Sequence, residues 1–299
     1  MEQFGTVAIL GVGLIGGSIG LALRSRGLAR EVVGIGRHAG SIDEAVQRGA
    51  IDRGTTELRQ GIASADVVVV CTPVDRVAED VRLCAGVAGP DVLITDAGSS
   101  KRQIVDLVER QPQSSGVFVG AHPVAGSEKK GVAHARGDLF EGRPCVLTPT
   151  SSTPPDRLSR ARRFWSSLGC RIVEMTPAEH DEILAYTSHL PHAVAGALAS
   201  AVPADWLPLA AGAFRDCTRV AAADTALWTA IFRENRGALL KALDSLRERL
   251  ASFQFALMTD DEDAIRRWWD EARLRRERFE RLPGNPGVVS GQSPARNLP

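Results

Sequence analysis

The stretch GVGLIGGSIG, residues 11–20, decides the fold, and it directly follows the apolar run VAIL at residues 7–10. Gly11, Gly13 and Gly16 form the pattern G-x-G-x-x-G between a predicted strand and a predicted helix. In that setting the first glycine allows a tight turn, the second lets a pyrophosphate approach the backbone, and the third lets the helix pack on the strand. A glycine-rich turn without a ligand is the alternative, but the βαβ context favours a dinucleotide-binding site.

Strand-like and helix-like segments alternate from this stretch onward. The expected strands cover residues 7–10, 31–35, 66–71, 92–95, 117–120, 145–148 and 170–174. The expected helices cover residues 15–26, 42–49, 77–84, 101–109 and 155–168. Parallel strands joined by crossover helices follow from such alternation. The sequence therefore predicts an α/β fold with a Rossmann-type, doubly wound parallel sheet.

After residue 176 the strand signals stop and the pattern becomes helical. Apolar-periodic runs at residues 178–201, 227–255 and 260–281 predict long helices, and the Pro/Gly/Ser-rich end predicts a disordered tail. We therefore expect three parts: a dinucleotide-binding Rossmann domain over 1–176, an all-α helical domain over 177–283, and a disordered tail over 284–299.

Composition excludes several classes of partner and site. The chain has 36 basic and 36 acidic residues, so its net charge does not favour nucleic acid or a membrane surface. No run approaches 18 apolar residues, and no leader sequence is expected. Small molecules are therefore the expected partners. The five cysteines are scattered without a C-x-x-C spacing, which predicts free thiols, no metal site and a cytoplasmic protein.

The end of the second predicted strand bears on the choice between NAD and NADP. An acidic residue there would bind the ribose 2′-hydroxyl of NAD, but this chain has Gly36 followed by Arg37 and His38. The guanidinium of Arg37 suits a 2′-phosphate, so NADP is slightly favoured and NAD stays open. A solvated surface arginine is the alternative. Further contacts to the cofactor are expected from Leu14, Ile15, Thr72 and Pro73.

Polar segments lie where the sheet edge would meet the helical domain. TDAGSSK (95–101) and GAHPVAGSEKKG (120–131) follow predicted strands, and TSHLPH (187–192) lies in the first long helix. Ligands of α/β proteins bind at the carboxyl ends of strands. Arg215 and Arg219, four residues apart, are expected on one helix face, which predicts an anion site if that face is not simply solvated.

These segments together carry a resemblance to a known family. GVGLIGGSIG, TDAGSSK, HPVAGSEKKG, SHLPH and FRDCTRVAAADTALWTAIFRENR occur in its order across residues 6–250. On them the chain resembles the prephenate dehydrogenases of tyrosine biosynthesis, a family that includes arogenate and cyclohexadienyl dehydrogenases. The resemblance implies a homodimer, the monofunctional form, and oxidative decarboxylation of prephenate to 4-hydroxyphenylpyruvate, or of arogenate to tyrosine.

The resemblance also implies roles for single residues. His122 would accept the proton of the ring hydroxyl, and Ser99 would orient that hydroxyl beside the nicotinamide. Arg219 would pair with the ring carboxylate of the substrate. The resemblance implies a substrate contact at His192 and a carboxylate that gates the active site at Glu128. Further substrate contacts are expected at Arg215 and His189. Arg215 stands where some members carry lysine, which leaves its role open, and His180 is expected to pack within its helix.

Other dehydrogenases and two kinds of non-catalytic protein are the alternatives to a prephenate dehydrogenase. A β-hydroxyacid or 6-phosphogluconate dehydrogenase would place a catalytic lysine in the first helix of the second domain, and residues 177–203 contain none. A non-catalytic NAD(P)-sensing protein would keep the glycine loop without needing His122, Ser99 and Arg219 in matching segments. A purely structural dimerisation protein would need neither the glycine loop nor these three residues.

Overall fold

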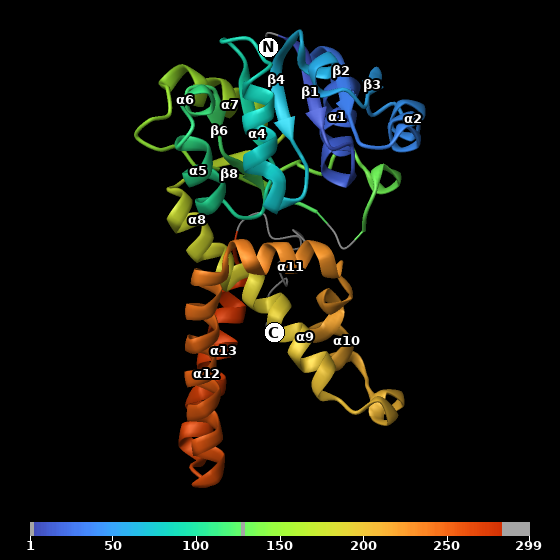
Figure 1. Cartoon of the computed structure of the whole chain (residues 1–299). Coiled ribbons are helices and arrows are strands. Elements are labelled where there is room, and N and C mark those ends of the chain that lie inside the picture. Colours follow the sequence, from blue (N-terminus) through green and yellow to red (C-terminus); the bar gives the residue numbers. More distant parts are fainter. Residues whose placement is uncertain (1–2, 127–128, 283–299) are drawn as a thin grey trace, which may run out of the picture. The chain divides into compact units, whose positions relative to one another are not determined.

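A six-stranded parallel sheet forms the N-terminal part of this computed structural model, which describes residues 3–126 and 129–282. The strand order is β3-β2-β1-β4-β5-β6, and every neighbouring pair is parallel (Figure 1). The strands are β1 (Phe4–Leu10), β2 (Ala29–Ile35), β3 (Arg53–Thr55), β4 (Ala65–Val70), β5 (Leu93–Asp96) and β6 (Phe118–Val119). The order reverses between β1 and β4, so the predicted doubly wound parallel sheet is confirmed.

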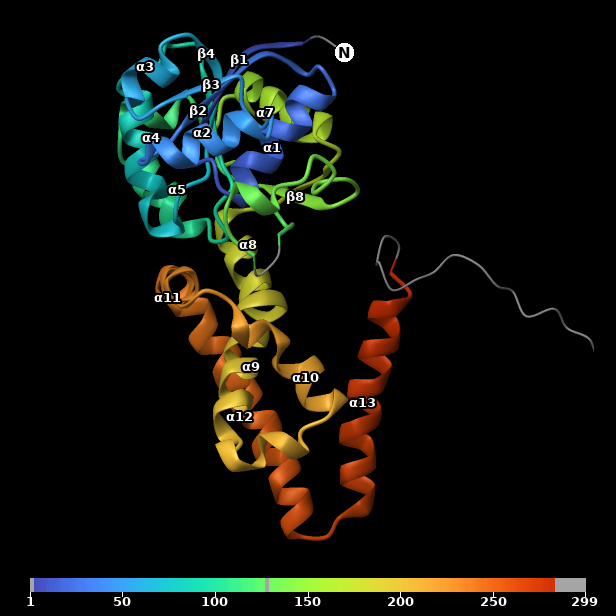
Figure 2. The same ribbon diagram turned by 90° about the vertical axis from the view of Figure 1, so that its right-hand side faces the viewer.

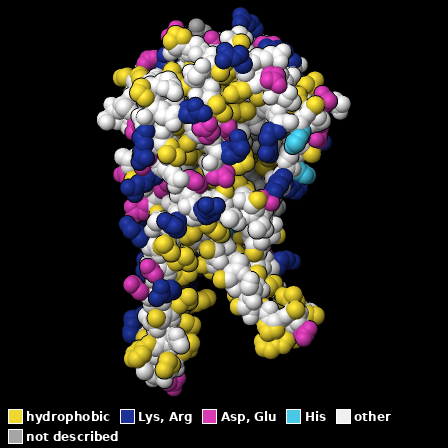
Figure 3. All heavy atoms as spheres, viewed as in Figure 1, with side chains coloured by type: hydrophobic (Ala, Val, Ile, Leu, Met, Phe, Trp, Pro, Cys, Tyr) yellow, Lys and Arg dark blue, Asp and Glu magenta, His cyan; other side chains and the backbone are white. Residues whose placement is uncertain are grey.

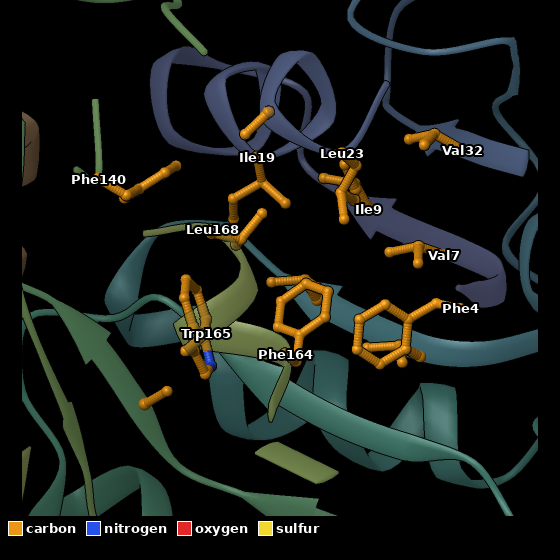
Figure 4. Close-up of a cluster of buried hydrophobic side chains, with 14 of the residues drawn as sticks. Phe4, Val7, Ile9, Ile19, Leu23, Val32, Phe140, Phe164, Trp165 and Leu168 are labelled. Atoms are coloured by element: carbon orange, nitrogen blue, oxygen red, sulfur yellow. The ribbon is translucent and has the colours of Figure 1, made fainter. Parts of the chain in front are cut away.

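Helices cover both faces of this sheet because successive side chains of a buried strand point to opposite faces. In β1, Val7 and Ile9 join one core cluster, to which α1 and α7 contribute, and Ala8 joins another with α4 and α5. Figure 4 shows the first cluster, in which Trp165 makes edge-to-face ring contacts with Phe140 and Phe164. The helices are α1 (Leu14–Ser25), α2 (Ala39–Gln47), α3 (Leu58–Ile62), η1 (Val74–Arg76), α4 (Val77–Ala85), α5 (Arg102–Glu109), α6 (Pro112–Ser115) and α7 (Pro155–Ser167).

A second, three-stranded sheet follows the first, and the sequence did not predict it. It consists of β7 (Ala121–Pro123), β8 (Pro144–Leu147) and β9 (Arg171–Glu174) in that order, with the short helix η2 (Val132–His134) between β7 and β8. β7 pairs antiparallel with β8, and β8 pairs parallel with β9. His122 therefore lies within a strand and does not follow one, because the chain leaves β6 and immediately pairs with β8.

The chain from Pro177 to Glu280 is helical, as expected. It comprises α8 (Pro177–Leu184), η3 (Ala185–His189), α9 (Leu190–Ala201), η4 (Ala204–Leu209), α10 (Gly212–Thr218), η5 (Arg219–Ala222), α11 (Thr225–Glu234), α12 (Arg236–Met258) and α13 (Glu262–Glu280). Figures 1 and 2 show α8 leaving the sheets and running on through η3 into α9. The η3 segment is π-helical, and it precedes Pro191, which has no N–H to donate to the helix.

Two compact units divide the described chain, one up to Ala242 and the other from Leu243. The second unit contains the end of α12 and all of α13, where Phe253 stacks on Trp268 with ring centroids 4.5 Å apart. The predicted domain boundary at residue 176 falls between β9 and α8 and stays a prediction, and the predicted tail over 284–299 lies outside the described residues. None of the described helices is long and apolar enough to cross a membrane.

Candidate active site

The glycine-rich loop between β1 and α1 needs glycine at two of its three motif positions for steric reasons. Gly11 has φ of +96°, and a Cβ there would lie 2.7 Å from the carbonyl oxygen of Cys71. A Cβ on Gly16 would lie 2.2 Å from the carbonyl oxygen of Gly11. A Cβ on Gly13 would meet nothing within 4 Å, so Gly13 borders open space. The first and third glycines thus serve packing, and the second leaves the backbone accessible.

The first turn of α1 leaves its backbone N–H groups available. Gly13 is the N-cap, no side chain caps the helix, and no acidic residue lies in the first turn. Such a turn attracts an anionic group through its unpaired donors and the positive end of the helix dipole. Leu14 and Ile15 begin this helix, and the side chain of Ile15 packs against the core. The turn therefore suits the pyrophosphate of a dinucleotide.

A cavity of about 450 Å³ opens at this turn, at the carboxyl ends of β1, β2 and β4. Five of the predicted cofactor-binding residues line it: Gly11, Gly13, Arg37, Thr72 and Pro73. The other three, Leu14, Ile15 and Gly16, lie in α1 and are not among its lining residues. The cavity is where the glycine loop, the end of β2 and the end of β4 meet, which fits the dinucleotide-binding prediction.

The charged groups around this cavity differ in whether they already have partners. Asp80 is buried, accepts a hydrogen bond of 2.6 Å from the Thr72 hydroxyl, and lies 3.6 Å from Arg76. Glu44 is paired with Arg48 at 2.9 Å. Arg37, by contrast, is exposed and forms no ion pair with any residue in the described ranges. Both carboxylates of the cavity are therefore compensated, and a guanidinium remains at its rim.

A second cavity, of about 580 Å³, brings together residues that are far apart in the sequence. Ser99 follows β5, His122 lies in β7, His192 lies in α9 and Arg219 lies in η5, and all four line this cavity. Its wall also includes Trp228 and Ile231 of α11, together with basic side chains that include Lys130, Arg136 and Arg143. Ile231 is buried in a cluster with residues of α4 and Val74 of η1, and α11 packs against η1.

His122 is held at this cavity by its strand. In the register of β7 and β8, His122 lies opposite Val146, and its neighbour Ala121 belongs to the core cluster. Because side chains alternate along a strand, His122 is directed away from that core. It is nevertheless buried, and its pKa is lowered well below 6.5, first by desolvation and then by the nearby His180, Lys101 and His189. The imidazole is therefore neutral at pH 7.

A chain of buried polar groups extends behind His122. Its Nδ1 lies 2.8 Å from Nε2 of His180, and Nδ1 of His180 lies 2.7 Å from an Asp181 carboxylate oxygen. The same carboxylate accepts hydrogen bonds from the backbone N–H groups of Lys101, at 2.7 Å, and Arg102, at 3.0 Å. The sequence assigned His180 to helix packing and gave no role to Asp181. The adjacent histidine and aspartate lie in the acidic stretch AEHDE, which gave no clear signal that they would be buried.

The segment TDAGSSK folds around a second buried carboxylate. Asp96 pairs with the ammonium of Lys101, and both side chains are fully buried. The Asp96 carboxylate also accepts 2.9 Å hydrogen bonds from the backbone N–H groups of Gly98 and Ala121. This carboxylate thereby ties the turn that carries Ser99 to the start of the strand that carries His122. The sequence singled out the segment but did not predict this pair.

His192 lies against the ring of Trp228, which also lines the cavity. Its Nδ1–H donates to the carbonyl oxygen of Ser188 at 2.9 Å, and its ring stacks on Trp228 with centroids 3.5 Å apart. Its pKa is lowered, first by desolvation and also by the positive charge of Arg219. His192 thus presents a neutral imidazole close to a guanidinium, an arrangement suited to a polar, anionic ligand.

Two predicted substrate-binding residues in the described ranges, Arg215 and His189, do not line this cavity. The side chain of Arg215 is 80% exposed and pairs with Asp216, because α10 ends at Thr218 and only Arg219 reaches the cavity. His189 is buried, and its Nδ1 accepts a hydrogen bond from Asn235 at 3.0 Å. Burial lowers the pKa of His189 to about 4. Glu128 lies outside the described residues. The expectation that both arginines share one helix face is wrong.

The described residues hold no group of three or more His, Cys, Asp or Glu side chains that could bind a metal ion. The five cysteines are free thiols, and four of them are at least partly buried. The polar side chains that line the second cavity include imidazoles, a hydroxyl and guanidiniums.

Two domains that are characteristic of one protein family match this chain. Residues 19–174 match "Prephenate dehydrogenase, nucleotide-binding domain", and residues 176–271 match "Prephenate dehydrogenase, dimerization domain". The first match contains every strand except β1 and most residues of the first cavity, and the second contains His192 and Arg219.

Individual relatives agree with these matches. The prephenate dehydrogenase of Bacillus subtilis is 31% identical over 307 residues, which cover 95% of this chain and 83% of that protein. The structure of prephenate dehydrogenase from A. aeolicus, in complex with hydroxyphenyl propionate and NAD+, is 32% identical with a TM-score of 0.86, covering 93% of this chain and 99% of that one. The structure of Synechocystis arogenate dehydrogenase is 30% identical with a TM-score of 0.79, covering 92% and 99% of the two chains.

Proposed function

Because the chain belongs to the prephenate dehydrogenase family and is an NAD(P)-dependent oxidoreductase, we propose that it converts prephenate to 4-hydroxyphenylpyruvate and CO2. The observation that carries this proposal is the second cavity. It combines a buried neutral imidazole, a serine hydroxyl and a guanidinium, contributed by His122, Ser99 and Arg219. A base, a hydroxyl partner and a carboxylate partner are the groups that this reaction requires.

The first cavity supplies the residues that would hold the dinucleotide. The open backbone at Gly13 and the uncapped first turn of α1 fit a pyrophosphate, and Thr72 and Pro73 line the same cavity. When bound, the nicotinamide supplies the site that accepts a hydride from the ring carbon bearing the hydroxyl. A predominantly apolar wall formed by the strand ends favours binding of the flat rings.

His122 accepts one proton during the reaction and later returns it. As the hydride leaves the ring, the imidazole takes the proton of the hydroxyl on the same carbon, which forms a carbonyl there. When the carboxylate on the opposite ring carbon departs as CO2, its bonding electrons enter the ring and leave a phenolate. His122 then returns the proton to the phenolate oxygen. The lowered pKa suits this role, because the imidazole is unprotonated at pH 7 and gives up its proton readily.

Ser99 and Arg219 position the substrate for this step. The hydroxyl of Ser99 would hydrogen-bond the ring hydroxyl and hold it beside His122. Arg219 would pair with the ring carboxylate, and a two-point contact of this kind fixes the plane of the ring. His192 would contact the side-chain end of the substrate. These roles are supported by the common cavity that the four residues line.

Steady-state kinetics with two substrates tests the proposal. The purified chain should oxidise prephenate with release of one CO2 and formation of one reduced cofactor per substrate consumed. Arogenate differs at the side chain, where an amino group replaces the keto group, and should be the poorer substrate by kcat/KM. A higher kcat/KM for arogenate would assign the enzyme to the arogenate branch of the family, and turnover of neither substrate would overturn the proposal.

We also propose that NADP+ is used at least as well as NAD+. No acidic residue stands at the end of β2, and Arg37 at the rim of the cavity makes no ion pair with described residues. A guanidinium in that place can bind a 2′-phosphate. Arg37→Ala should lower kcat/KM for NADP+ by at least about tenfold, the loss of ~1.4 kcal/mol, and leave the value for NAD+ unchanged. Arg247→Ala, at an exposed arginine paired with Asp244, is the control.

A tenfold preference of the unsubstituted enzyme for NAD+ would contradict this cofactor proposal. Unchanged NADP+ kinetics in Arg37→Ala would remove Arg37 from it and leave the absence of a carboxylate as its sole support.

We propose, finally, that the chain forms a homodimer through its helical part from residue 177 onward. Figure 3 shows hydrophobic side chains gathered on this part. Trp206 and Leu209, both in η4, are 64% and 87% exposed. In the second unit Phe255, Met258 and Trp269 are also exposed. Exposed apolar surface on this scale is typical of an interface between subunits. Sedimentation equilibrium should give the mass of a dimer, and a monomer at all concentrations would contradict this.

A further inference from the structure

The polar chain behind His122 has a direction that follows from the chemistry of its members. Both oxygens of Asp181 accept hydrogen bonds from backbone N–H groups, at Lys101 and Arg102, as an ionised carboxylate does. Its contact with Nδ1 of His180 therefore requires that this nitrogen carries the hydrogen. A neutral imidazole has one N–H, so Nε2 of His180 is an acceptor.

The same reasoning continues to His122. Because Nε2 of His180 accepts, Nδ1 of His122 must donate across the 2.8 Å between them. The lone pair of a neutral His122 is then on Nε2, and His122 lines the second cavity. The opposite tautomer would place two lone pairs face to face within a site that water does not reach, because His180 is fully buried.

The charged neighbours are consistent with neutral imidazoles in this chain. The groups that face it are Lys101 at the N-terminus of α5, Asp96 at the end of β5, Asp181 in α8 and His189 in η3. Lys101 already pairs with Asp96. Desolvation is the first cause that lowers the pKa of both His122 and His180.

Asp181 has a second structural consequence. The two backbone N–H groups that it binds begin α5, directly after the turn that carries Ser99. One carboxylate on α8 thus fixes both the segment of Ser99 and the hydrogen-bonded chain that ends at His122. The relative position of the two groups that contact the reacting hydroxyl depends on it.

We propose that His180 and Asp181 are positioning residues that hold His122 in the tautomer with hydrogen on Nδ1 and a free lone pair on Nε2. This inference rests on the proposed function for its catalytic meaning, since a base with the wrong tautomer has no lone pair to offer the substrate hydroxyl. The tautomer itself is a property of the resting protein and is measurable without substrate.

Nitrogen-15 NMR of the resting protein tests the tautomer. At pH 8 the His122 ring, assigned by its loss from the spectrum of His122→Asn, should show a protonated Nδ1 and an unprotonated Nε2. A protonated Nε2 in the unsubstituted protein would overturn the proposal whatever any variant does. If this protein shows the expected tautomer but does not oxidise prephenate, the proposed function fails and the assignment of the tautomer stands.

Two substitutions of His180 separate positioning from general packing. His180→Phe fills the space but accepts no hydrogen bond, so His122 should shift towards the Nε2–H tautomer and kcat should fall by about 10²-fold or more, with KM within about threefold. His180→Gln offers an amide oxygen to Nδ1–H of His122 and should retain the tautomer and most of kcat. Equal kcat and unchanged nitrogen signals in both variants would contradict the proposal.

Discussion

Acid should destabilise the folded chain through its buried histidines, and His189 gives the clearest case. Its side chain is almost fully buried, and desolvation lowers its pKa from 6.5 to about 4. The unfolded chain binds a proton near pH 6.5 and the folded chain does not bind it until about pH 4. Stability from His189 is therefore complete above pH 6.5 and is lost as the pH falls from 6.5 to 4.

The amount of stability lost follows from the difference between the pKa values of His189 in the unfolded and folded chain. A lowering of the pKa from 6.5 to about 4 corresponds to on the order of 3 kcal/mol in the free energy of unfolding. This is a large share of the 5–15 kcal/mol that is usual for a folded domain, so partial unfolding near pH 4 is expected. His122 and His180 change stability in the same direction, since burial lowers the pKa of each.

Urea unfolding at a series of pH values isolates the contribution of His189 to the pH dependence of the unfolding free energy. His189→Gln keeps an acceptor for the side-chain amide of Asn235 but cannot take a proton, so its stability should fall less steeply below pH 6.5. The two curves of unfolding free energy against pH, measured at one protein concentration, should approach each other by about 3 kcal/mol between pH 7.5 and 4. Parallel curves would refute the reasoning.

Further substitutions have expected effects of their own. Arg219→Ala should raise KM for prephenate about 30-fold, since losing a charged pair costs ~2 kcal/mol or more, whereas Arg215→Ala, outside the cavity, should change it little; equal effects would contradict the assignment. Gly16→Ala should destabilise the fold by about 1–3 kcal/mol through its 2.2 Å contact, while Gly13→Ala should keep the melting temperature and weaken dinucleotide binding, as calorimetry would show. Lys101→Met should cost about 3–5 kcal/mol by leaving a buried carboxylate unpaired, and an unchanged melting temperature would argue against that pair.

The features predicted correctly from the sequence are those with strong local patterns. Seven predicted strands and the major helices of the first part match within a few residues, because apolar runs alternate with amphipathic ones. Several short elements were missed, among them β3, α3 and α6 at residues 53–55, 58–62 and 112–115, since three to five residues give too little periodicity to detect. The strand of His122 was missed for the same reason.

The cavity residues were found through motifs, but their partners were not. Ser99, His122, His192 and Arg219 line one cavity, as the segments in which they lie indicated. The link from His122 to His180 joins residues 58 positions apart, and a single sequence carries no sign of such a contact. The end of α10 at Thr218, between Arg215 and Arg219, was also not predicted, because the i, i+4 rule assumes an unbroken helix.

The central claim is that His122 is the base that takes the hydroxyl proton, and the pH dependence of kcat/KM for prephenate tests it most directly. For the unsubstituted enzyme, kcat/KM should rise with pH through one group below 6.5, lower than the 6–7 expected for an ordinary imidazole, because burial lowers the pKa of His122. In His122→Asn that limb should vanish and kcat should fall by about 10² to 10⁴-fold. A variant that retains the limb, or nearly normal kcat, would show that the proton leaves by another group.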